Sequence, residues 1–146
     1  MNRHKAGRAC TVLVVLFTIG CSKSVETAEA ATEEFRRRCA RGAFSDIFLD
    51  AAPEFQKSAN ERDFVKLMDN VREQLGNCQS SKRSAWQAFA GTGGQAVTLI
   101  YNSEFERGTA TEEFVWRIRG EATVLLGYHI SSPTLRHQMI DVFTDL

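Results

Sequence analysis

The sequence predicts an α+β fold in which N-terminal helices pack on one face of a four-stranded, curved antiparallel meander. Between Gly94 and Ser132 apolar residues alternate with polar ones, and short glycine-containing turns at residues 106–108 and at Gly120 separate the alternating runs. This pattern is typical of antiparallel hairpins. Upstream, between residues 32 and 75, apolar residues recur every three or four positions, as in amphipathic helices. Because one face of the sheet is polar, the helices are expected to cover only the other face.

The chain begins with a segment that resembles an export signal. Basic residues precede an apolar run over residues 10–19, which is too short to cross a bilayer as a permanent helix. Residues 1–20 are therefore expected to be a lipoprotein signal peptide. The dipeptide Gly20-Cys21 resembles the end of a bacterial lipobox, which makes Cys21 the expected lipidation site. The alternative is an ordinary secretory cleavage that leaves Cys21 as a thiol.

A lipid on Cys21 predicts a protein of the bacterial cell envelope, anchored to the membrane and facing the periplasm. Two or three acyl chains bind a membrane firmly, whereas one chain alone binds only marginally. Ser22, rather than aspartate, follows the cysteine and resembles the outer-membrane sorting pattern of enteric-type bacteria. Residues 21–31 are small, polar and acidic, and are expected to form a tether or the frayed start of the first helix. A single domain over residues 32–146 follows.

The charge balance argues against nucleic acid as a partner. The chain has 18 Lys and Arg and 18 Asp and Glu, and three of the basic residues but no acidic one lie in the first twenty positions. Removal of that leader leaves 15 basic against 18 acidic side chains. The resulting net charge is negative, so the domain has no excess of basic groups with which to attract a polyanion such as nucleic acid.

Cys39 and Cys78 are the cysteines of the expected domain. Two cysteines in an oxidising compartment most simply pair, so a Cys39–Cys78 disulfide is expected. They do not form a Cys-x-x-Cys motif, and the histidines of the domain lack the spacing of metal ligands. The sequence therefore predicts no metal site and no cofactor.

Helical segments are expected before the sheet and one after it. The first runs from Thr32 to Gly42, and a short second one begins at Ser45 and is interrupted or restarted at Pro53. After Pro133, apolar residues at helical spacing predict a last short helix over residues 135–146.

The clearest helix is expected over residues 58–76. Ser58 and Glu61 have the spacing of a capping box, and Gly76 offers a C-terminal stop. The apolar face between them consists of Phe64, Leu67, Met68, Val71 and Leu75. This helix is the expected lid over the apolar face of the sheet, with Cys78 placed to link its end to Cys39 of the first helix.

The strands are expected at residues 83–90, 94–105, 109–119 and 122–131. One parity of the last three strands carries the expected inward-facing residues: Val97, Leu99, Tyr101, Phe105, Phe114, Trp116, Ile118, Val124, Leu126, Tyr128 and Ile130. Glu104, Glu113 and His129 have the opposite parity. No carboxylate is therefore expected to face the interior, where a general base would be needed.

The order of elements looks like the cystatin-like cone of the nuclear-transport-factor and ketosteroid-isomerase superfamily. Within that class, five short motifs stand in a characteristic order: RGAF (41–44), AAPEF (51–55), VREQLG (71–76), VTLIYNSEF (97–105) and LGYHI (126–130). In these motifs the chain resembles an uncharacterised family of secreted bacterial proteins and lipoproteins that carries a domain of unknown function, number 4019. The resemblance covers residues 27–131, implies the cone architecture, and brings no known activity.

Two functions are compatible with these observations. The leading hypothesis is a non-catalytic binding or interaction domain that meets an envelope protein through the polar sheet face, where Arg117, Arg119 and His129 lie. The alternative is a pocket for a small apolar molecule or lipid beside Tyr101, Trp116 and Tyr128, although such residues are more often core residues. An isomerase or dehydratase would need an inward carboxylate or histidine, so no catalytic residue is expected. The oligomeric state is left open.

Overall fold

The computed structural model describes the backbone of residues 19–135 and the side chains from residue 23 onward. The expected signal peptide and the expected terminal helix therefore lie almost wholly outside the described residues, as does the side chain of Cys21. Within these described residues, four helices are followed by four strands: α1 (Ile19–Arg41), α2 (Phe44–Leu49), α3 (Pro53–Ser58), α4 (Glu61–Leu75), β1 (Cys78–Gly91), β2 (Gly94–Phe105), β3 (Gly108–Arg119) and β4 (Ala122–Ser131).

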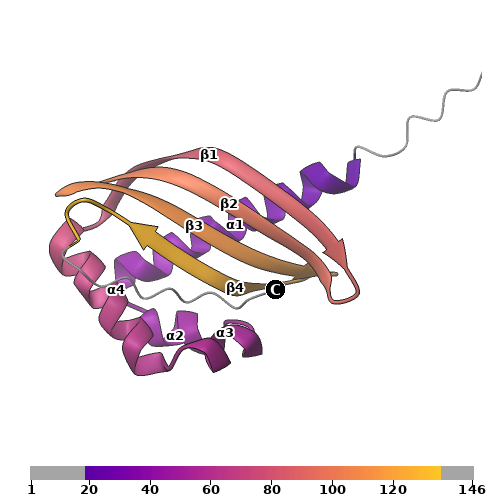
Figure 1. The fold of residues 1–146 in the computed structure, drawn as a ribbon, viewed down its shortest axis with the longest axis horizontal. Helices are drawn as coiled ribbons and strands as arrows, with labels where there is room; N and C mark the ends of the chain where they lie inside the picture. Colours follow the sequence, from indigo (N-terminus) through magenta and orange to yellow (C-terminus); the bar gives the residue numbers. More distant parts are fainter. Residues whose placement is uncertain (1–18, 136–146) are drawn as a thin grey trace, which may run out of the picture.

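The strands form one open sheet in the order β1-β2-β3-β4, and each neighbouring pair is antiparallel. The helices pack on one face of this curved meander (Figure 1), so the predicted α+β class is confirmed. The first strand begins at Cys78, earlier than the expected residue 83.

A β-bulge in β4 changes which of its residues face the helices. Trp116 lies opposite Leu125, and Leu126 is the extra residue that follows it. Leu125 therefore joins the core cluster, and Leu126 is buried as expected, at 5% exposed. The expectation that Val124 points inward is wrong, because a one-residue insertion reverses the faces of the residues before it, and Val124 lies opposite Arg117.

Helix α1 runs diagonally across the sheet and contacts all four strands (Figure 1). The expectation that helix 58–76 is the lid over the sheet is therefore wrong. That helix, α4, closes one end of the helical layer, where Leu67, Val71 and Leu75 pack with Ala110 of β3. The space between sheet and helices is thus bounded by α1 along its length and by α4 at its end.

The first helix begins well before Thr32, the expected start. Val25 and Ala28 are buried and belong to the main core cluster, so the segment expected to be a tether is part of a packed helix. Small side chains on this stretch of α1 allow it to lie close to the sheet. Within residues 19–135, no helix combines the length and the apolar character that crossing a bilayer requires.

Helix α4 is capped by residues other than those expected. Oδ1 of Asn60 accepts a hydrogen bond from the backbone N–H of Asp63 at 2.9 Å, whereas Ser58 belongs to α3 and donates to the carbonyl of Phe55. The capping box expected at Ser58 is therefore wrong. At the other end, the Arg107 side chain donates to carbonyls in the last turn of α4 at 2.7 to 3.2 Å, which satisfies acceptors that a helix end leaves free.

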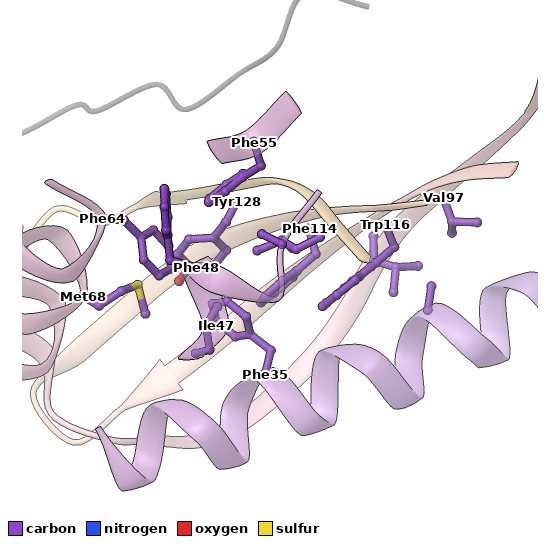
Figure 2. Close-up of a cluster of buried hydrophobic side chains, with 14 of the residues drawn as sticks. Phe35, Ile47, Phe48, Phe55, Phe64, Met68, Val97, Phe114, Trp116 and Tyr128 are labelled. Carbon is purple, nitrogen blue, oxygen red and sulfur yellow. The ribbon is translucent and has the colours of Figure 1, made fainter. Parts of the chain in front are cut away.

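Aromatic rings dominate the core between the sheet and the helices (Figure 2). The ring centroid of Phe114 on β3 lies 5.0 to 6.4 Å from the ring centroids of four neighbours: Phe35, Tyr101, Trp116 and Tyr128. A second aromatic group joins the short helices to α4: Phe48, Phe55 and Phe64.

Candidate functional site

Glu112 is the buried carboxylate at the centre of the candidate site. It lies on β3 between Ala110 and Phe114, on the face that meets the helices, and is only 3% exposed. Residues two apart on a strand share a face, so its buried neighbours place Glu112 inside the fold. The expectation that no carboxylate faces the interior is therefore wrong.

Three side chains donate hydrogen bonds to Glu112. The hydroxyl of Tyr128 on β4 donates to Oε1 at 2.9 Å. Nη2 of Arg36 on α1 donates to Oε2 at 2.9 Å, and the hydroxyl of Ser103 on β2 donates to the same oxygen. Both carboxylate oxygens are thus occupied, and the network joins α1 to three neighbouring strands of the sheet.

Arg36 is the counter-ion of Glu112, and its side chain is 13% exposed. Its guanidinium carbon lies 4.7 Å from the ring centroid of Tyr101 and 5.6 Å from that of Phe114. It also donates to the hydroxyl of Ser81 on β1. Aromatic faces and a carboxylate suit a partly buried arginine. Its Nε, however, is buried without a hydrogen-bond partner among the described residues.

This network forms part of the wall of a cavity of about 80 Å³ between α1, α4 and the sheet. Apolar side chains supply much of the remaining wall: Phe35, Phe44, Met68, Val71 and Phe105. Exposed Arg72 and Asn77 also line the cavity, so it reaches the surface near the end of α4. An apolar enclosure with a few convergent polar groups is the common form of a small-molecule site.

Cys39 and Cys78 both line this cavity. They are free thiols in this structure, and the Cys39–Cys78 disulfide stays a prediction. Burial is the main cause that raises the pKa of each thiol, and the Arg36 guanidinium acts in the opposite direction. A thiol whose ionised form is disfavoured is a weak nucleophile, so these cysteines are poor candidates for catalysis.

The three residues predicted to line a pocket have different surroundings. Tyr128 lines the cavity beside Glu112. Tyr101 is buried under the guanidinium of Arg36. The indole N–H of Trp116 donates a hydrogen bond to Oγ1 of Thr32 at 2.9 Å. The Trp116 ring also borders a second cavity, of about 370 Å³, between α1, α2 and β4. Only Tyr128 of the three therefore contributes a polar group to the site around Glu112.

The three residues predicted to form an interaction surface are also not equivalent. Arg117 donates two hydrogen bonds to Glu54 of α3, at 2.9 and 3.1 Å, and this contact is the main cause that lowers the pKa of Glu54. His129 is half-buried and lies opposite Glu113. Arg119 is exposed at the end of β3. Arg117 thus links β3 to α3, and Arg119 is the member of the set most accessible to a partner.

Comparisons with protein-family models, curated proteins and solved structures gave no match. The function is therefore argued from the geometry of the site.

Glu112 and Arg36 were not identified from the sequence as site residues. Glu112 has the parity of Phe114 and Trp116, so strict alternation places it inside, and only its charge argues against that position. Arg36 lies in a run of three arginines at residues 36–38. It is four residues after Thr32, which is buried, so Arg36 shares the inward face of the helix and Arg37 and Arg38 do not.

The arrangement favours binding over proton transfer. Glu112 already accepts hydrogen bonds at both oxygens. Burial and the Glu112 charge raise the pKa of Tyr128 well above its usual value, so this hydroxyl remains a donor. Within the side chains that the structure describes, no group of three or more His, Cys, Asp and Glu residues could hold a metal ion.

Proposed function

We propose that this protein is a lipid-anchored lipoprotein of the bacterial cell envelope whose domain binds a small ligand in the cavity beside Glu112 and Tyr128. The observation that carries the binding function is an apolar cavity whose wall includes the hydrogen-bonded residues Arg36, Glu112 and Tyr128. The anchor is supported by Gly20-Cys21 after a short apolar run. Membership of the number 4019 family, with its cystatin-like cone, belongs to the same proposal and is supported by the order of helices and strands.

The size of the cavity limits the ligand to a small molecule. A volume of about 80 Å³ is roughly half that of the engineered 150 Å³ cavity that admits benzene. The apolar side chains of Met68 and Val71 favour an apolar portion on the ligand. Arg36, which lines the cavity, favours a hydrogen-bond acceptor on it, since a guanidinium only donates hydrogen bonds. We therefore propose that the ligand is a small amphipathic molecule that carries a hydrogen-bond acceptor.

A proton-transfer enzyme fits this site less well. A general base must present a free lone pair to its substrate, but Glu112 is paired with Arg36 and also accepts from Ser103 and Tyr128. Binding requires no rearrangement of this network, so it is the function that the geometry supports best.

Titration of the full chain with three small probes, followed by NMR chemical shifts, tests the binding site. We expect acetone and propanoate, which accept hydrogen bonds, to shift resonances of cavity residues, and propylammonium, which only donates, to shift them less. Ala40→Trp is expected to abolish these shifts, because Ala40 lines the cavity and a large ring there fills its entrance.

Ala30→Trp is the matched control. Ala30 and Ala40 are both exposed residues of α1, but Ala30 lies on an earlier part of the helix, away from the cavity. The binding proposal is wrong if no probe produces shifts at the cavity, or if Ala40→Trp and Ala30→Trp respond alike.

Intact mass and membrane partition of the bacterially expressed chain test the anchor. We expect a membrane-bound protein that starts at Cys21 and carries acyl chains, with a mass lower by two hydrogens because of the Cys39–Cys78 disulfide. Cys21→Ser removes the acceptor of the lipid, so this variant is expected in the soluble fraction. Cys39→Ser should keep the lipid and lose only the two-hydrogen deficit. A mature wild-type chain without acyl groups would contradict the anchor.

A further inference from the structure

Strand β1 is an edge strand of 14 residues that pairs only with β2. Edge strands expose unpaired backbone N–H and C=O groups, and most proteins guard them with charges, proline, bulges or covering elements. The opposite edge is guarded in this way, because the backbone N–H of Ala52 donates to the carbonyl of Leu125 on β4 at 2.8 Å. Within residues 19–135, no backbone hydrogen bond from outside the sheet reaches β1.

The two halves of β1 differ in how well they are guarded. The first half carries Lys82 and Arg83, and a bulge follows at Ser84. Arg83 pairs with Glu29 of α1 at 2.7 Å. From Ala85 to Gly91 the strand has no charge, no proline and no bulge. The unguarded part of the edge is therefore residues 85–91.

Large apolar side chains are exposed on this same segment. Trp86 is 50% exposed and Phe89 is 61% exposed. Trp86 lies opposite buried Leu99 and so faces the helical side, whereas Phe89 faces the other side of the sheet. Figure 1 shows β1 at the outer border of the sheet, with its last residues at the end of the sheet remote from α4. Both faces of residues 85–91 thus present apolar surface at a bare edge.

We propose that residues 85–91 pair in antiparallel fashion with the same residues of a second copy of this chain, which joins two four-stranded sheets into one of eight strands. A two-fold axis makes an antiparallel edge complementary to itself, because each strand offers the groups that the other lacks. The axis falls at Ala88, the middle of the unguarded segment. The facing pairs are then Ala85 with Gly91, Trp86 with Ala90, and Gln87 with Phe89.

This register fits the side chains of the segment. The large ring of Trp86 lies opposite the small side chain of Ala90, so the two chains can approach closely. Lys82 and Arg83 fall outside the paired segment at both ends, and like charges do not face each other. A register centred on Arg83 would instead place Arg83 opposite itself, which is destabilising. The charge pattern and the side-chain sizes therefore favour a second copy as the occupant of this edge.

Sedimentation of the full chain in a density-matched detergent tests the proposal with two matched double variants. Gln87 and Phe89 are both exposed, and the register places each opposite the other in the partner. Gln87→Glu/Phe89→Glu puts like charges opposite each other twice, and Gln87→Lys/Phe89→Glu puts opposite charges there. We expect the wild-type chain to be a dimer. The dissociation constant of the Gln87→Glu/Phe89→Glu dimer is expected to be about tenfold higher than that of the Gln87→Lys/Phe89→Glu dimer.

A monomeric wild-type chain would overturn the proposal, and so would equal dissociation of the two double variants. Circular dichroism spectra of both variants are expected to match, and so is thermal unfolding at concentrations where both are monomeric, since the two positions are exposed and the variants differ only at residue 87. A difference in sedimentation then reports the facing pairs rather than the stability of the domain.

Discussion

Replacing Glu112 with alanine is expected to lower the free energy of unfolding by about 3–5 kcal/mol, because removing one partner of a buried ion pair leaves the other charge unpaired. Arg36, whose side chain is 13% exposed, would lose its counter-ion. The hydroxyls of Tyr128 and Ser103 would lose their acceptor at the same time. Urea denaturation of the wild type and the variant at the same pH measures the difference.

The neighbouring Glu113 provides the matched control. It is half-buried and points to the other side of β3, so Glu113→Ala is expected to change the free energy of unfolding by less than about 1 kcal/mol. Equal losses for the two variants would contradict the central role of Glu112. Arg36→Leu/Glu112→Leu leaves no charge unpaired, and is expected to be more stable than Glu112→Ala.

Replacing Phe114 with alanine is expected to cost about 3–5 kcal/mol of the free energy of unfolding, the usual range for a buried phenylalanine. Its side chain is 0% exposed and its ring lies beside four other aromatic rings, of which Phe35, Trp116 and Tyr128 are labelled in Figure 2. The cavity left behind spans α1 and three strands, which restricts how far the neighbours can collapse into it. Urea denaturation should show a lower midpoint with an unchanged slope.

Leu49→Ala is the comparison for this variant. Leu49 is also a large apolar residue, but it is 61% exposed, so its truncation is expected to change the free energy of unfolding by less than about 0.5 kcal/mol. If Phe114→Ala lost no more stability than Leu49→Ala, the aromatic cluster would not be the main source of core stability.

The central part of the sheet could be predicted because β2 and β3 each have one covered and one wetter face. Alternation over β2 and β3 identified Val97, Leu99, Phe114 and Trp116 as inward residues, and all four are buried. Glycine at the turns fixed where the chain reverses. Gly94, for example, has φ 112° and lies where a Cβ would come within 2.5 Å of the Ile118 carbonyl oxygen, so the residue type itself marks the position.

The parts that the sequence did not predict depend on packing over long distances. Helix α4 has the clearest amphipathic pattern, yet α1 covers the sheet, because α1 uses small residues such as Ala28 and Thr32 that carry little hydrophobic signal. The bulge at Leu126 has no local signature that periodicity detects. Alternation places Glu112 inside, but a buried carboxylate is expected only with a counter-ion, and Arg36 lies 76 residues earlier in the chain. The pairing of the two residues, rather than the parity of Glu112, is therefore what the sequence does not reveal.

The placement of α1 across all four strands also determines when this helix can find its partners. Thr32 meets Trp116 across 84 residues, whereas the hairpins of the meander join segments that are adjacent in the chain. Closing long loops costs more entropy than closing short ones, so we expect the hairpins to form before α1 docks on them. Synthesis proceeds in the opposite order, since α1 is made first and β4 last. The apolar face of α1 is therefore expected to stay exposed longest during folding. During that time it is the part of the chain most prone to aggregate with other proteins.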